Sequence, residues 1–309
     1  AAERTVAGYA IDDALELLHK AVSLGPSEAA QAELWRAIGQ ASVLKFDGEG
    51  FWSAMLRAAD LCGEPEPLAA IYAELAIETA TRSGMWRSRP PNDVLDGWIE
   101  QALELTDPAS EAHAKALIAH SFWERNTPVA AREASELAER SGDVDLRSYA
   151  WGARGAVAFG EQDFESALTW SRRRLNVKDE ISDPDHVADI YEITIPSCCA
   201  NAQFSEARRL AAEHDAIVEP LSDHHRLHGV AVLLEVEEVC AGWNRILEHG
   251  ERTEAAVEAN LATPCVRNAR ALLLIALAAA ATGDNDTARR YERRAEEVEI
   301  EGYDLVLAA

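Results

Sequence analysis

The sequence predicts an all-α fold in which about seven helical hairpins follow one another along a right-handed superhelix, or solenoid. Apolar residues recur at helical spacing almost throughout, and glycine and proline fall mainly between the periodic segments. No stretch alternates apolar and polar residues for long enough to predict a sheet. We expect hairpins of roughly forty residues to fill the whole chain as a single domain over residues 1–309.

One stretch shows the hairpin clearly. Trp151, Gly155 and Ala158 lie on a first helix, and Phe164 and Ala167 lie on a second. A large residue followed by a small one lets antiparallel helices approach closely, which is typical of tetratricopeptide repeats. The same layout recurs with Tyr191, Phe204 and Ala207, and again with Leu272, Gly283 and Ala288.

Turn residues separate the expected helices. Gly25-Pro26-Ser27 ends the first helix and starts the second, because glycine suits a C-terminal cap and serine can cap the next helix. Pro196 falls inside a predicted helix and should kink it or shift its start. The expected helices cover residues 5–24, 27–44, 48–62, 66–83, 92–105, 109–124, 128–140, 143–159, 161–175, 184–200, 203–218, 223–241, 243–260, 264–281 and 285–299.

The segment Trp86–Pro91 interrupts this pattern. It is too long and too rich in proline for a tight turn between repeats. We expect an exposed loop there, and an arm that docks a partner is the alternative.

Charge and composition narrow the function classes. With 29 Lys and Arg against 54 Asp and Glu, the net charge of −25 repels nucleic acid and anionic lipid, so neither is an expected partner. Five cysteines without a CxxC pair indicate reduced core residues in a cytoplasmic protein. The apolar run Ala269–Ala281 is too short to span a membrane and is expected to be a buried helix. Because the chain starts Ala-Ala-Glu-Arg, we interpret it as a fragment of a longer polypeptide.

The histidine-rich sequence at residues 224–228 is the strongest candidate for metal chemistry. His224 and His228 are four residues apart and share a helix face, as a zinc pair requires. However, Glu235 lies about 10 Å further along the helix axis and cannot easily join the same ion. We therefore predict no metal site and expect these residues at an exposed helix start.

Other polar groups also favour structural roles. Cys198 and Cys199 are predicted to be small core residues, and Arg172-Arg173-Arg174 is predicted to lie on a solvated helix face. The sequence contains no glycine-rich phosphate loop, serine elbow or catalytic acid pair. The chain is therefore predicted to be neither an enzyme nor a cofactor-binding protein.

A candidate binding site lies on the predicted inner face. In tetratricopeptide geometry the first helices line the concave groove, and the repeat register places His113, His120, Trp123 and Tyr149 there. These aromatic and hydrogen-bonding side chains predict contact with a peptide or a small ligand. Packing residues would show the same pattern.

The segment Leu44–Glu49, followed by Phe51, Trp52 and Met55, resembles the start of the C-terminal tetratricopeptide region of large bacterial signalling proteins. Proteins of that family combine a class III adenylate or guanylate cyclase domain with an AAA-type ATPase domain and helical repeats. The resemblance implies that any cyclase or ATPase activity belongs to domains before this chain.

The leading hypothesis is a non-catalytic scaffold that mediates protein contact or senses a ligand within a bacterial nucleotide-signalling or STAND-like regulator. Its partners would be a protein or peptide, a small ligand in the groove, and other domains of the same polypeptide. The alternatives are the inducer-binding sensor arm of an ATP-dependent transcriptional regulator and a stand-alone helical enzyme.

Overall fold

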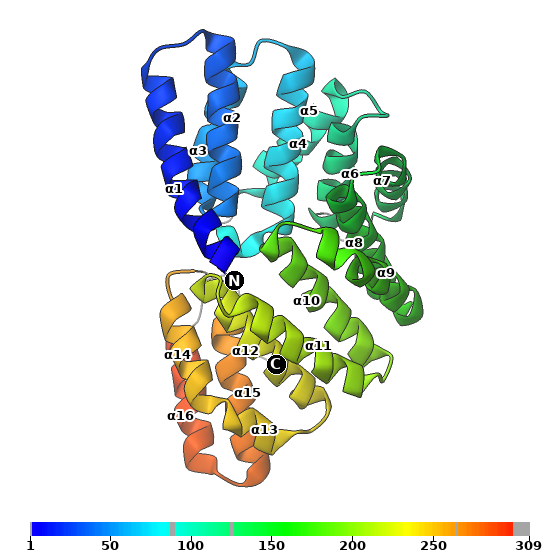
Figure 1. The fold of residues 1–309 in the computed structure, drawn as a ribbon. Helices are drawn as coiled ribbons and strands as arrows, with labels where there is room; N and C mark the ends of the chain where they lie inside the picture. Colours follow the sequence, from blue (N-terminus) through cyan, green and yellow to red (C-terminus); the bar gives the residue numbers. More distant parts are fainter. Residues whose placement is uncertain (1, 87–89, 124–126, 264, 299–309) are drawn as a thin grey trace. The chain divides into compact units, whose positions relative to one another are not determined.

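The computed structural model describes residues 2–86, 90–123, 127–263 and 265–298. Over these ranges the chain forms sixteen α-helices and two short 3-10 helices, and no strand. The predicted all-α fold is therefore confirmed (Figure 1). Among the described helices, none combines the length and apolarity needed to cross a membrane.

The chain divides into two compact units, residues 1–160 and 161–309. The single domain over 1–309 stays a prediction. The helices of the first unit are α1 (Ala2–Ser23), α2 (Glu28–Leu44), α3 (Gly48–Leu61), α4 (Pro65–Thr81), η1 (Ser83–Met85), α5 (Asn92–Leu105), α6 (Glu111–Trp123), α7 (Pro128–Ser141) and α8 (Val144–Gly160). Those of the second are α9 (Phe164–Val177), η2 (Lys178–Glu180), α10 (Pro184–Ala200), α11 (Phe204–Val218), α12 (Asp223–Val239), α13 (Trp243–Glu248), α14 (Gly250–Asn260), α15 (Val266–Thr282) and α16 (Asn285–Glu297).

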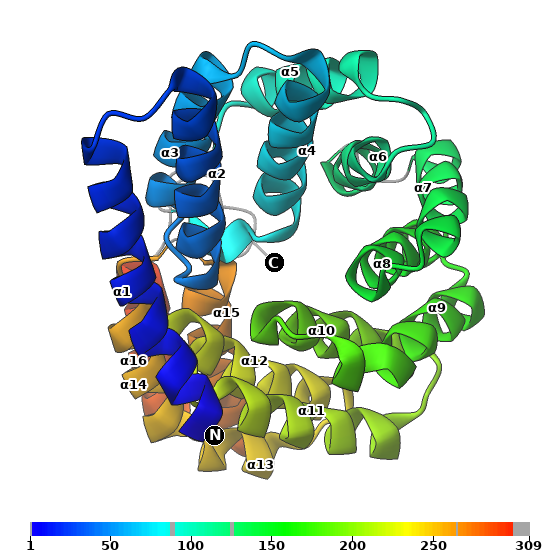
Figure 2. The same ribbon diagram turned by 45° about the horizontal axis from the view of Figure 1, so that its top comes forward.

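Each unit consists of successive hairpins whose first helices lie next to one another. In the first unit α4, α6 and α8 form one row, with α5 and α7 outside it (Figure 2). In the second unit α10, α12 and α15 are the neighbouring first helices, and α11, α14 and α16 are packed against them. The solenoid arrangement predicted from the sequence is thus present within each unit.

The turns inside the hairpins repeat one backbone conformation. Gln162, Ala202, Ala241 and Gly283 all have positive φ angles, of 64°, 56°, 51° and 90°, and they follow one another at steps of about forty residues. In each turn, the residue with this left-handed conformation reverses the chain and is followed by the N-cap residue of the next helix. Where aspartate follows it, the carboxylate caps that helix, as in the bond from the backbone N–H of Ser166 to Asp163, 3.1 Å long.

The core of the first unit contains an aromatic cluster of Phe51, Trp52 and Trp86. Trp86 is only 4% exposed, and its ring lies 4.4 Å from that of Trp52 between ring centroids. The expectation of an exposed segment is therefore wrong for Trp86, because the residue follows η1 back into the core beside Phe51. Pro90 is buried and Pro91 is exposed, whereas Arg87–Arg89 lie outside the described residues.

Two further expectations need correction in the second unit. Arg174 is fully buried rather than solvated, and its guanidinium bonds to the carboxylate of Asp189 at 2.7 Å. The single helix expected over 243–260 is divided at His249 into α13 and α14. Pro196 lies inside α10, which still begins at Pro184, so Pro196 does not shift the start of the helix and the kink stays a prediction. The Pro196 side chain is exposed.

Candidate functional site

The residues predicted to line a groove all lie on first helices of the first unit. His113 and His120 are on α6 and Tyr149 is on α8, each half-buried. Trp123 is the last residue of α6, and its side chain lies outside the described residues.

The structure gives two of these side chains partners within the unit. His113 Nδ1 lies 2.9 Å from the hydroxyl of Thr106, and the Tyr149 hydroxyl accepts a hydrogen bond of 3.3 Å from Arg82. Ligand binding by this group stays a prediction.

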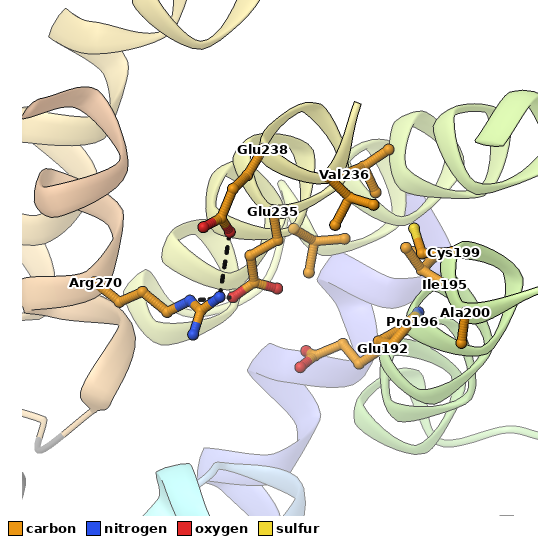
Figure 3. A pocket seen from close by; sticks show the side chains of 11 residues that line it. Glu192, Ile195, Pro196, Cys199, Ala200, Glu235, Val236, Glu238 and Arg270 are labelled. Atoms are coloured by element: carbon orange, nitrogen blue, oxygen red, sulfur yellow. Dashed lines mark hydrogen bonds and ion pairs between the residues drawn. The ribbon is translucent and has the colours of Figure 1, made fainter. Parts of the chain in front are cut away.

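A pocket of about 490 Å³ lies between α10, α12 and α15 in the second unit (Figure 3). The first helices of three successive hairpins thus build it. Aliphatic side chains supply most of its wall, and charged groups lie at one side. The lining residues are Glu192, Ile195, Pro196, Cys199, Ala200, Val232, Glu235, Val236, Glu238, Val239 and Arg270.

Ion pairs fix the charged side of the pocket. Arg270 reaches from α15 toward α12, where its guanidinium lies 3.3 Å from Glu238 and 3.6 Å from Glu235 (Figure 3). Arg267 also pairs with Glu235, at 3.2 Å. Because these bonds join successive hairpins, they hold the apolar wall and the charged side in register.

Cys199 contributes a thiol to the pocket wall. Burial, followed by the neighbouring thiols of Cys240 and Cys198, raises the pKa of Cys199 to about 11. At neutral pH the side chain is therefore a protonated, weakly nucleophilic thiol. The predicted role of Cys198 as a core residue is confirmed, since it is 1% exposed.

The histidine-rich start of α12 is buried rather than exposed. His224 and His225 are only 8% and 7% exposed, because α10 and the start of α15 cover this end of the helix. His225 Nε2 lies 2.8 Å from Asp185. The expectation of a solvated helix start is wrong. The helices that cover this end of α12 come from other hairpins, which the local sequence does not show.

His228 lies at the centre of a polar network between three helices. Its Nδ1 is 2.7 Å from Oε1 of Glu192 on α10, and its Nε2 is 3.4 Å from Sγ of Cys265. Arg267 also bonds to Glu192. Along the chain, Glu192 lies 36 residues before His228 and Cys265 lies 37 after it. Residues one repeat step apart thus meet side by side, and this spacing is the signal that could have found the network.

The electrostatics of this network are strongly coupled. Burial alone would raise the pKa of Glu192, but His228 and Arg267 together hold it well below its usual range. Burial opposes charge on His228 as well, yet the Glu192 carboxylate raises the pKa of His228 to about 9. In contrast, burial and the adjacent His228 and His225 lower the pKa of His224 to about 3.

Comparison with known proteins does not identify a family. No family model matches the sequence. No curated protein matches it either. Among solved structures, the chain is similar to pilF of Pseudomonas aeruginosa, with 15% sequence identity and a TM-score of 0.47, covering 79% of this chain and 97% of that one. That similarity does not establish what this chain binds.

The pocket between α10, α12 and α15 therefore defines the candidate site by its geometry. Its volume lies within the range of pockets that take small ligands, and it is also large enough for one or two apolar side chains. Charged groups beside an apolar wall allow orientation as well as burial of an occupant. The pocket is therefore suited to binding an occupant that has both apolar and charged groups.

Proposed function

We propose that the chain is a non-catalytic helical-repeat scaffold that binds a segment of a partner protein in the pocket between α10, α12 and α15. The observation that carries this proposal is that the first helices of three successive hairpins together line an open, largely apolar pocket of about 490 Å³. A segment anchored there would contact all three hairpins at once.

The chemistry of the pocket favours a segment with a large apolar residue next to lysine or arginine. Val232, Val236 and Val239 offer aliphatic surface, and Val239 is 56% exposed. The three carboxylates that line the pocket are paired with Arg267 and Arg270, but the whole chain carries a net charge of −25. A basic segment is therefore attracted during encounter, and its apolar residue supplies the contact area.

His113, His120, Trp123 and Tyr149 remain a second proposed contact surface, in the first unit. The positions of α6 and α8 among the first helices support it. Replacing His120 and Tyr149 with alanine is expected to weaken partner binding while the melting temperature changes by only a few degrees, as for surface changes below about 1 kcal/mol. A large fall in melting temperature would instead assign both residues to packing.

The resemblance of Leu44–Glu49 and Phe51, Trp52 and Met55 to bacterial signalling proteins supports a place within a larger nucleotide-signalling regulator. The runner-up function is the inducer-binding sensor arm of an ATP-dependent transcriptional regulator. The pocket volume supports this second function, because small ligands occupy pockets of this size.

Fluorescent peptides can test the pocket. One series places a tryptophan or leucine between lysines or arginines, and the other places it between glutamates. Ala200 lines the pocket and is exposed, so Ala200→Trp should fill the pocket and weaken binding of the basic series at least tenfold. Ala281→Trp is the matched control, because Ala281 is exposed on α15 outside the lining.

The proposal predicts that the basic series binds more tightly than the acidic one and that added salt weakens it. Equal binding by both series, or unchanged binding in Ala200→Trp, would contradict the proposed site. A small apolar dye provides a further measurement. If Ala200→Trp abolishes binding of the dye and neither peptide series displaces it from the unchanged chain, the result would favour the small-ligand function.

A further inference from the structure

Three side chains with metal-binding atoms converge at the start of α12 and α15. One nitrogen each of His224 and His228 and the sulfur of Cys265 all lie within 4.8 Å of one another. We propose that they form a zinc site that ties the second hairpin of the second unit to the third. None of the three residues lines the proposed binding pocket, although Glu192, which contacts His228, does.

The backbone brings these atoms together from two helices. His224 and His228 are four residues apart on α12, so both point to one side, and their ring centroids are 4.1 Å apart. Cys265 caps the start of α15 in an extended conformation, which turns its side chain toward α12.

The distances fit a tetrahedral ion after a small adjustment. With zinc bonds of about 2.1 Å to nitrogen and 2.3 Å to sulfur, neighbouring ligand atoms in a tetrahedron are about 3.5 Å apart. His228 Nε2 and Cys265 Sγ are already 3.4 Å apart. The widest pair, at 4.8 Å or less, must close by about 1 Å, which rotation of a side chain provides.

A carboxylate already orients one of the histidines. Glu192 Oε1 lies 2.7 Å from Nδ1 of His228, Arg267 lies 2.9 Å from the same nitrogen, and Nε2 faces Cys265 Sγ. An ion bound at Nε2 displaces the proton from that nitrogen. A carboxylate on the far nitrogen of a ligating histidine is the usual outer contact of zinc sites. Glu192 is therefore a positioning residue.

The donor set favours a borderline or soft metal ion, and copper accepts the same three ligands as zinc. Two imidazole nitrogens and one thiolate suit zinc, and they exclude calcium and magnesium, which take oxygen ligands. Among the described residues no fourth protein atom joins the group, so a water molecule completes the tetrahedron.

The same Cys265–His228–Glu192 line also resembles the nucleophile, base and orienting acid of thiol hydrolases. Such a triad does not use His224, whereas a zinc ion uses both histidines. Cys265 is also only 8% exposed, which restricts the access that a nucleophile needs. Zinc therefore accounts for more of the cluster.

Titration of the chelator-treated chain with zinc chloride tests the proposal by calorimetry. We expect one high-affinity site per chain, and roughly hundredfold weaker binding after the double change His224→Gln and Cys265→Ser. The matched control is His249→Gln with Cys240→Ser, a pair outside the cluster, which should bind zinc as the unchanged chain does.

Cobalt chloride provides a second measurement on the unchanged chain, so the test does not depend on variants that fail to fold. A thiolate-to-cobalt charge-transfer band and visible bands of tetrahedral intensity are expected, and both should disappear when zinc is added. Absence of saturable binding, a cobalt spectrum without the thiolate band, or equal binding in the cluster variant and the control would overturn the site.

Discussion

At the scale of single residues, burial changes the chemistry that the sequence indicates. Arg174 belongs to a run of three arginines that is typical of a solvated face, yet its side chain is fully buried and paired with Asp189. His224 and His225 are also buried. In each case a neighbouring helix, which the local sequence does not show, supplies the cover and the partner.

Cys199 offers a test of burial at the pocket. Its pKa of about 11 lies above the usual value near 8.5, so at pH 8 the reactive thiolate should be roughly two hundredfold scarcer than in free cysteine. We expect iodoacetamide labelling of Cys199, followed by mass spectrometry, to rise about tenfold per pH unit up to pH 10. Cys199→Ser identifies the labelled peptide. A labelling rate that reaches its plateau near pH 9 would show that the thiol is not buried as described.

At the scale of elements, the hairpin turns and the helix starts were the most predictable features. Positive φ angles at Gln162, Ala202 and Ala241 recur at the repeat step, although none of these residues is glycine. Their shared position directly before a second helix fixes the conformation, because the chain must reverse there to pair the two helices. The helix break at His249 was missed, since the sequence on both sides of it stays helical in pattern.

Two glycines in the first unit give a matched stability test. A Cβ atom on Gly48, at the start of α3, would lie 2.5 Å from the Met85 carbonyl oxygen and 2.6 Å from the Trp86 ring. Gly48→Ala should therefore destabilise the fold by about 2 kcal/mol or more, because backbone must move.

Gly97 in α5 is the control, since a Cβ atom there meets nothing within 4 Å. Gly97→Ala should stabilise the chain by about 0.5–1 kcal/mol, because alanine restricts the unfolded chain and favours the helix. Denaturant melts followed by circular dichroism measure both changes. Similar stability of the two variants would contradict the packing of Trp86 against α3.

At the scale of the whole molecule, the chain consists of two compact helical units. In the first unit, residues about one repeat step apart join first helices of successive hairpins, such as Arg36 on α2 and Glu74 on α4, which form a bidentate pair. Ion pairs of this kind link successive hairpins and fix their register.

The scaffold proposal predicts that purified residues 1–309 neither hydrolyse nor cyclise ATP. Both reactions require metal-binding carboxylates and a phosphate cradle, and the sequence has no glycine-rich phosphate loop. Phosphate release and cyclic nucleotide formation can be measured on the same preparation. Turnover that survives purification and disappears when a residue of this chain is changed would contradict the proposal.

The sequence by itself determined the all-α fold, the hairpin step and most helix boundaries, because apolar periodicity and turn residues act over a few neighbouring positions. It did not determine the burial of Trp86 and Arg174, the pocket, or the approach of Cys265 to His228. Those features join residues from different hairpins, and only the tertiary structure decides which helix faces meet. The pair His224 and His228 therefore has no third metal ligand nearby in the sequence, and the fold brings Cys265 of the next repeat close to it.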